Sequence, residues 1–218
     1  MYNPIIQNGS KKFGNNRWKS YSIKIQRDVF LFSDLEYDNW LLNECNPKVI
    51  TFCEQPFEIL IPYKSQIRKS IPDMWILYDN GDEEIVEVKY ASELEKTKVI
   101  EQIEIQQQWC KERNIKHRVA TDENIRKSKL LLSNNKFIIK MLKNQPQINS
   151  EFQMQLLKDL NVFSQIKISE YSTNNRFSDK MILNTLAYLV FRGDISADLS
   201  NTHFGLNMEV SVNNVKGF

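Results

Sequence analysis

The 218-residue chain has few cysteines, no long apolar run and almost no net charge. Its three cysteines are odd in number and form no Cys-x-x-Cys pair, so we expect neither a disulfide framework nor a zinc site, but reduced thiols in a cytoplasmic protein. No apolar run approaches the roughly 20 residues that span a bilayer, and the first ten residues lack the apolar region of a signal peptide. A formal net charge of +2 says little about partners.

Basic residues are concentrated locally, although the whole chain is nearly neutral. Residues 1–32 carry Lys11, Lys12, Arg17, Lys19, Lys24 and Arg27 against Asp28, and residues 121–147 carry Arg126, Lys127, Lys129, Lys136, Lys140 and Lys143 against Asp122 and Glu123. Such segments can contact phosphate backbones, and they can equally be solvated faces. Charge alone leaves both interpretations open.

The order of expected elements predicts an α/β domain over residues 21–145, after an irregular N-terminal arm at 1–20. Ser33 and Glu36 have the spacing of a capping box that opens a helix. Apolar and turn patterns then predict strands at 49–53, 57–63, 72–78 and 84–90, a helix at 92–113, a strand at 116–120, and helices at 121–132 and 134–143. This order indicates a mixed sheet with helices packed on it.

A second, smaller domain is expected over residues 150–218, after a linker at 144–147. An amphipathic helix is predicted over 178–191, and Gly193 ends it. Segments 195–199 and 205–212 could then form the strands of a wing. The pattern predicts a C-terminal winged-helix-like module.

Two carboxylates and a lysine carry the candidate chemistry. Asp73 begins one strand, and Glu87 and Lys89 lie two apart on the next, so their side chains leave the same face. Val88 points the other way, while its carbonyl could reach a metal. Mg²⁺, or Mn²⁺ in its place, can activate water and neutralise phosphoryl charge in phosphodiester hydrolysis, and a lysine can assist the nucleophile. We therefore predict a metal site at Asp73, Glu87 and Val88, with Lys89 beside it.

Each of these residues also has a purely structural interpretation. Glu87 and Lys89 could form a same-face ion pair on a solvated strand. Glu36 is the reciprocal carboxylate of the Ser33 capping box. Core packing is the favoured interpretation of Trp75 and Trp109, and the two histidines, His117 and His203, are expected to be satisfied or surface residues.

The metal-site hypothesis makes a demand on the turn that contains Asn80 and Gly81. A two-residue turn would place Asp73 opposite Val88, on the wrong face from Glu87 and Lys89. The loop must therefore hold an odd number of residues, or a strand must be irregular. We expect a three-residue loop at 80–82, with positive φ at Gly81 or Asp82, or an irregular strand start at Pro72, and carboxylates of Asp73 and Glu87 within about 5 Å.

The ordered ensemble resembles the restriction-endonuclease-like core of PD-(D/E)xK nucleases and, within them, the TnsA family. The segments that carry this resemblance are Ser33–Glu36, Glu54-Gln55-Pro56, Ile71-Pro72-Asp73, Glu87-Val88-Lys89 and Val119–Asp122, followed by Leu186–Leu189, Gly193-Asp194-Ile195 and Asp198-Leu199, which are similar to that family's winged-helix domain.

The resemblance implies a Mg²⁺-dependent endonuclease that cuts the 5′ strands of double-stranded DNA at transposon ends. It implies two partners, a DDE transposase subunit and an AAA+ ATPase regulator. Glu36, Asp73 and Glu87 would hold the metal, and Lys89 would assist the nucleophile. Two alternatives stay open, namely a restriction or repair nuclease of the same superfamily and a non-catalytic DNA-binding assembly module.

Overall fold

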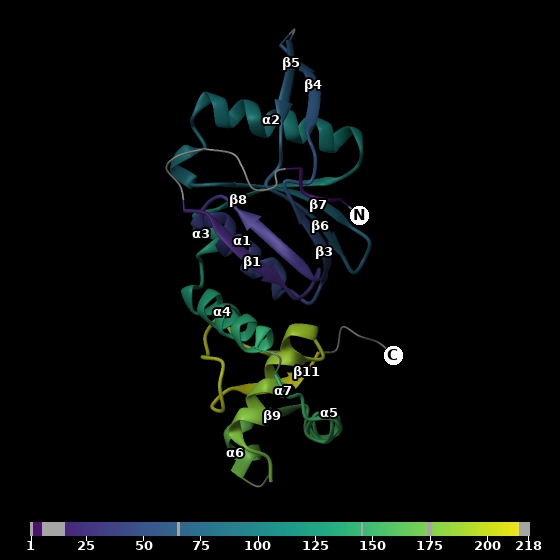
Figure 1. The fold of residues 1–218 in the computed structure, drawn as a ribbon, viewed down its shortest axis with the longest axis vertical. Coiled ribbons are helices and arrows are strands. Elements are labelled where there is room, and N and C mark those ends of the chain that lie inside the picture. Colours follow the sequence, from purple (N-terminus) through teal and green to yellow (C-terminus); the bar gives the residue numbers. More distant parts are fainter. Residues whose placement is uncertain (1, 6–15, 65, 145, 174–175, 214–218) are drawn as a thin grey trace. The chain divides into compact units, whose positions relative to one another are not determined.

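A computed structural model describes residues 2–5, 16–64, 66–144, 146–173 and 176–213, and divides the chain into two compact units (Figure 1). The first unit comprises Met1–Glu44 and Lys48–Lys127, and the second comprises Cys45–Pro47 and Ser128–Phe218. Ten residues of the expected N-terminal arm, 6–15, lie outside the described residues.

The first unit is built on a four-stranded mixed sheet. Its strands lie in the order β3 (Val49–Glu54), β6 (Met74–Tyr78), β7 (Glu83–Lys89) and β8 (Lys116–Thr121). The first two neighbouring pairs are antiparallel, and β7 and β8 are parallel. A parallel pair needs a long crossover, which here contains α2 (Thr97–Glu112). The expected mixed α/β core is therefore confirmed.

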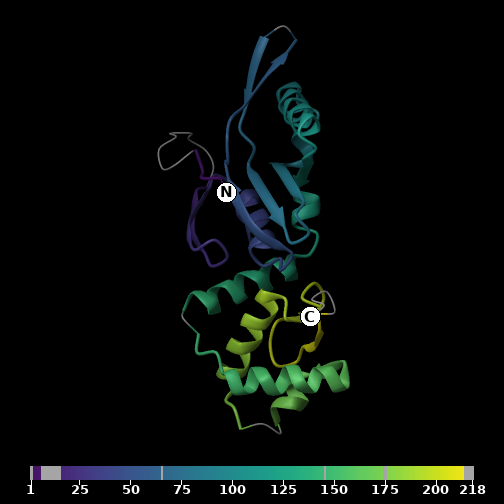
Figure 2. The same cartoon turned by 90° about the vertical axis from the view of Figure 1, so that its right-hand side faces the viewer.

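Helices cover both faces of this sheet (Figure 2). On one face, α1 (Asp34–Glu44) reaches the sheet through Asn39, whose amide lies 3.8 Å from the sulfur of Met74. On the other face, Cys110 of α2 packs with Trp75 and Ile85 of the sheet. Trp75 is only 5% exposed, which confirms its predicted core position.

Two hairpins complete the first unit. One pairs β1 (Trp18–Ser22) with β2 (Arg27–Leu31), and the other pairs β4 (Ile59–Tyr63) with β5 (Gln66–Ser70). The sequence patterns predicted a strand at 57–63 but did not predict β5. In both views β4 and β5 extend beyond the main sheet (Figures 1 and 2).

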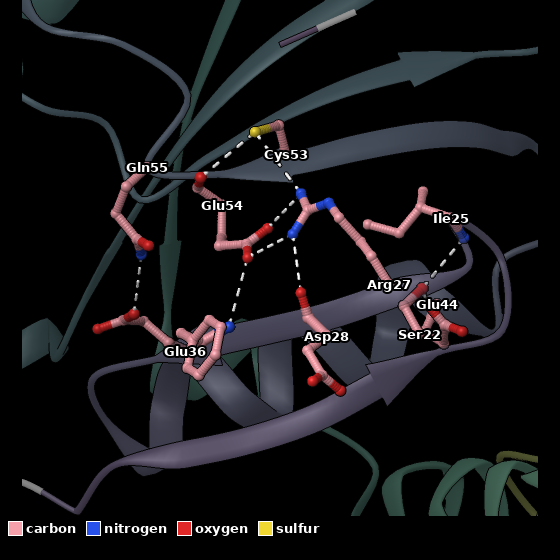
Figure 3. A network of polar contacts seen from close by, with 10 residues as sticks. Ser22, Ile25, Arg27, Asp28, Glu36, Glu44, Cys53, Glu54 and Gln55 are labelled. Carbon is pink, nitrogen blue, oxygen red and sulfur yellow. Dashed lines mark hydrogen bonds and ion pairs between the residues drawn. The ribbon is translucent and has the colours of Figure 1, made fainter. Parts of the chain in front are cut away.

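Buried glutamates hold the first hairpin in place (Figure 3). Residues 23–26 form the turn of this hairpin, in which the backbone amides of Ile23 and Lys24 donate to the Glu44 carboxylate at 2.7 and 3.1 Å. Both guanidinium nitrogens of Arg27 contact the carboxylate of Glu54 at 2.7 Å. These contacts fix β1 and β2 against α1 and β3.

The turn between β6 and β7 contains an odd number of residues, as predicted. The amide of Tyr78 donates to the carbonyl of Asp82 at 2.9 Å, so residues 79–81 form the loop, and Gly81 has φ +83°. The expected loop at 80–82 was wrong by one residue. Strand register explains the difference, because Leu77 pairs with Glu83 and the buried Trp75 pairs with the buried Ile85.

Two expected helices are interrupted. The segment 92–113 begins as the short 3-10 turn η1 (Ala91–Glu93) and becomes α2 only at Thr97. The segment 121–132 contains α3 (Asp122–Ile125) and then a break. Ser128 caps a new helix after that break by accepting a hydrogen bond from the amide of Leu131.

The second unit combines helices with a small antiparallel sheet in the order β10-β11-β9. Its core contains Phe152, Leu156, Leu160, Ile182 and Leu186. The elements in chain order are α4 (Lys129–Lys143), α5 (Ser150–Phe163), β9 (Gln165–Lys167), α6 (Ile168–Thr173), α7 (Asp179–Arg192), β10 (Ile195–Ala197) and β11 (Glu209–Val212).

The second unit begins earlier in the chain than the expected domain boundary at 145–150. The structure places the division after Lys127, because the apolar face of α4, which includes the buried Ile138, packs into the core of the second unit. Within the described parts of the chain, no helix is both long and apolar enough to cross a membrane.

Candidate active site

Asp73 lies immediately before β6, where the backbone leaves the β4–β5 hairpin and enters the main sheet. Met74 pairs with Val86, so continuation of this register would place Asp73 opposite Glu87. The Asp73 carboxylate accepts a hydrogen bond from the Val88 amide at 2.7 Å. The preceding Pro72 has no amide proton, so a side chain rather than the usual backbone ladder joins the strands at this point.

Glu87 and Lys89 project from the same face of β7, as their spacing predicts. Glu87 is fully buried, and its carboxylate accepts a hydrogen bond from the Lys89 ammonium group. The Lys89 side chain is 19% exposed, so this ion pair is not on a solvated strand. The side chain of Val88 is also buried.

Glu36 both caps α1 and belongs to the candidate site. Its backbone amide donates to the Ser33 hydroxyl at 3.1 Å, as in a capping box. Its carboxylate accepts from the Phe32 amide at 3.0 Å and from the Ser33 hydroxyl at 3.1 Å. The same carboxylate interacts electrostatically with Asp73 and Lys89. The capping interpretation and the site interpretation are therefore compatible.

The charges of this group shift one another's pKa values. Burial and the neighbouring Asp73 raise the pKa of Glu36, and the same two causes raise the pKa of Glu87. Burial alone would lower the pKa of Lys89, but the carboxylates of Asp73 and Glu87 raise it above its ordinary value. Glu36, Asp73, Glu87 and Lys89 thus form one electrostatic cluster from three separate parts of the chain.

Two glutamines that contact Glu87 were not among the site residues predicted from the sequence. Gln102 and Gln106 of α2 donate to its two carboxylate oxygens at 2.6 and 2.7 Å. Gln106 also donates to the Ser70 hydroxyl at 2.9 Å, and its carbonyl oxygen lies 2.9 Å from Nε2 of His117. Since that oxygen can only accept, His117 donates from Nε2. The usable signal was the pair of glutamines four residues apart on the helix after β7.

Burial keeps His117 neutral. Desolvation lowers its pKa to about 4, and its Nδ1 atom, buried, accepts no hydrogen bond from the described residues. This histidine is therefore a hydrogen-bond donor to Gln106 near neutral pH. His203, by contrast, is exposed.

The donor set suits a hard divalent cation. Among the described residues, no three Asp, Glu, His or Cys side chains converge into a metal-binding group. Mg²⁺, however, needs only one or two carboxylates because it keeps several of its waters. Asp73 and Glu87 offer two, and their mutual repulsion would be relieved by a cation. The residues present therefore fit an oxygen-bound divalent ion.

The basic segments are partly engaged within the protein. Arg27 binds Glu54, Lys19 lies 2.9 Å from Asp28, and the Lys24 ammonium group donates to the Val49 carbonyl. Lys11 and Lys12 lie outside the described residues. The local basic excess of residues 1–32 thus overstates the positive charge available to a phosphate backbone.

Comparison with known families matches the segment that carries most of this cluster. Residues 46–122 fit the family model described as TnsA-like endonuclease N terminal. The matched segment contains Asp73, Glu87, Val88 and Lys89, whereas Glu36 precedes it. No curated protein matches the chain. The match confirms the resemblance predicted from the sequence, because residues 46–122 are similar to the TnsA-like endonuclease N-terminal domain.

Proposed function

We propose that this protein is a metal-dependent DNA endonuclease that nicks the 5′ strands at transposon ends as the TnsA-type subunit of a cut-and-paste transposase complex. A DDE transposase and an AAA+ ATPase are its proposed partners. The observation that carries the proposal is the coupled cluster of Glu36, Asp73, Glu87 and Lys89, three members of which lie inside the TnsA-like segment.

Asp73, Glu87 and the Val88 carbonyl would hold Mg²⁺ or Mn²⁺, with Glu36 on the α1 side of the same group. A divalent ion bound there supplies Lewis acidity toward the phosphoryl oxygen and lowers the pKa of a bound water. Gln102 and Gln106 orient the Glu87 carboxylate from behind. Such second-layer contacts fix ligand geometry.

Lys89 is the proposed assistant of the nucleophile. Its ammonium group is mostly buried beside Glu87 and carries a raised pKa because of the neighbouring carboxylates, so it stays protonated at neutral pH. A fixed positive charge in a partly dry site stabilises charge that develops on the scissile phosphate. In this role Lys89 orients the attacking water and neutralises the phosphoryl oxygens.

The second unit would be the winged-helix-like partner domain. The succession α5-β9-α6-α7-β10-β11 and the sheet order β10-β11-β9 support this assignment. Several of its cations are paired with acids, as in the contacts Lys167–Glu170 and Arg192–Asp194. Residues 150–218 carry six Lys and Arg residues against seven Asp and Glu residues, and this near-neutral balance favours protein contact over strong phosphate binding, whereas α4 carries four lysines and no acidic residue.

Strand cleavage tests the catalytic assignment. Asp73→Asn and Lys89→Met should each lower the rate of Mg²⁺-dependent nicking by at least about a hundredfold, because each removes a group that acts on the transition state. Asp79→Asn, at an exposed position of the β6–β7 loop, is the matched control and should cut like the wild type. Wild-type cutting by either site variant, with a normal circular dichroism spectrum, would overturn the assignment.

The dependence on partners tests the transposition role. We expect little cleavage by the chain alone, and 5′-strand nicking when a cognate DDE transposase and transposon-end DNA are added. Efficient, sequence-specific cutting by the purified chain would favour the restriction or repair nuclease. Absence of cutting under all these conditions, with DNA binding retained, would favour the non-catalytic assembly module.

A further inference from the structure

Gln55 has an unusual backbone for its residue type. It follows β3 directly, has φ +38° although it is not glycine, and is only 3% exposed. A non-glycine residue in this region of backbone conformation is strained and persists only where its surroundings enforce it. The chain therefore holds a strained residue inside the first unit.

The neighbours of Gln55 are the candidate site itself. Its backbone amide donates to the carbonyl of Asp73 at 3.1 Å, and its side-chain amide nitrogen lies 3.5 Å from a carboxylate oxygen of Glu36 (Figure 3). The preceding residue, Glu54, forms an ion pair with Arg27, and this contact fixes the end of β3, which Gln55 follows. Gln55 thus contacts the backbone of one acidic residue of the cluster and the carboxylate of another.

The side-chain oxygen of Gln55 makes no such contact. Oε1 is buried and accepts no hydrogen bond from the part of the chain that the structure describes. A buried carbonyl oxygen without a hydrogen-bond donor destabilises the folded state, and such groups are rare in folded proteins. The opposite amide orientation would turn the oxygen toward the Glu36 carboxylate, so the nitrogen is the better hydrogen-bonding partner there.

We propose that Gln55 is a further residue of the metal site, and that its Oε1 atom is a neutral oxygen donor to the divalent cation beside Asp73 and Glu87. Amide carbonyl oxygens suit Mg²⁺ and Mn²⁺. A donor without charge also adds coordination without increasing the repulsion among three nearby carboxylates. This inference rests on the proposed function, because it adds a ligand to the same site.

Gln55→Met is the decisive variant, since methionine keeps a similar unbranched shape and removes both polar atoms. Isothermal titration of the full chain with Mn²⁺ should show binding at least about tenfold weaker than in the wild type. The melting temperature of the metal-free variant should stay equal or rise, because an unpaired buried oxygen is removed. A purely structural role predicts unchanged Mn²⁺ affinity.

Gln26→Met is the matched control. Gln26 is another glutamine of the first unit with positive φ, +54°, and it caps the turn of the β1–β2 hairpin through the Ile23 carbonyl. Its replacement should leave Mn²⁺ affinity unchanged. Gln55→Gly provides a second test, because glycine relieves the backbone strain, so it should fold even if the methionine variant does not and should also bind Mn²⁺ more weakly.

Asp73→Asn separates failure of this inference from failure of the proposed function. If Asp73→Asn abolishes Mn²⁺ binding while Gln55→Met and Gln55→Gly bind like the wild type, Gln55 is not a ligand and the proposed function stands. If the wild type binds no Mn²⁺, or Asp73→Asn binds it equally well, the proposed site falls and the inference falls with it.

Discussion

The ion pair between Arg27 and Glu54 offers a direct test of how the N-terminal hairpin is attached. Glu54 is fully buried at the end of β3, and the guanidinium group of Arg27 holds both of its carboxylate oxygens at 2.7 Å. The perturbation is Arg27→Met, which keeps much of the apolar stem and removes the charge. It leaves a buried carboxylate whose remaining donor among the described residues is the Phe30 amide at 3.3 Å.

The expected cost follows from burial. Removing one member of a buried ion pair destabilises a protein by about 3–5 kcal/mol. The Arg27 side chain is 29% exposed, so water can reach part of the space it leaves, and solvent screening reduces the expected cost to about 2–3 kcal/mol. The double variant Arg27→Met/Glu54→Gln should recover most of this loss, because it removes the uncompensated charge.

Urea unfolding followed by tryptophan fluorescence measures this cost in the first unit alone. All four tryptophans of the sequence lie there, at positions 18, 40, 75 and 109. The control is Lys19→Met in the same hairpin, whose partner Asp28 is 43% exposed, and it should cost no more than about 1 kcal/mol. Equal losses for the Arg27 and Lys19 variants would refute the argument from burial.

Two further predictions concern the second unit and the pH dependence of the first. Gly193→Ala should destabilise the second unit by about 2–4 kcal/mol in calorimetry, because φ is +73° and a Cβ atom would lie 2.4 Å from a proline Cβ, whereas Gly205→Ala, in open space, should change little. Between about pH 6.5 and about pH 8, the unfolding free energy of the metal-free first unit should fall. Burial raises the pKa values of Glu36 and Glu87, so the folded state binds more protons than the unfolded state there. The lowered pKa of His117 makes the unfolding free energy rise with pH, but only below the ordinary histidine pKa of 6.5, so it does not affect this window. Urea titrations in EDTA that show rising stability across this window would contradict the assignment.

Local patterns were sufficient to predict the core of the first unit. Ser33 and Glu36 marked the start of α1, and the alternation around Glu87 and Lys89 placed both side chains on one face of β7. These features depend on residues close together in sequence, so propensity and spacing capture them. The odd loop length followed from geometry, because only certain pairings place Asp73 and Glu87 on one face.

The residues that were missed depend on contacts between distant segments. β5 contains Gln66, Ile67, Arg68 and Lys69, all exposed, so it has no buried face to give an alternating pattern. Its pairing with β4 supplies the order instead. The assignment of α4 to the second unit was missed for a related reason, since an amphipathic helix such as α4 does not reveal in its own sequence which core it joins.

Gln106 shows most clearly why the site could not be completed from spacing. On a helix with a predicted apolar stripe, a glutamine looks like a surface residue, yet Gln106 is fully buried. Its amide group supplies a donor to Glu87 and to Ser70 and an acceptor to His117, three residues from different strands. A buried amide needs all its partners at once, so it can be recognised only when the strands are assembled. The same reasoning applies to Gln55, because its side-chain oxygen without a donor among the described residues, and its position beside Glu36 and Asp73, depend on segments that are distant in sequence.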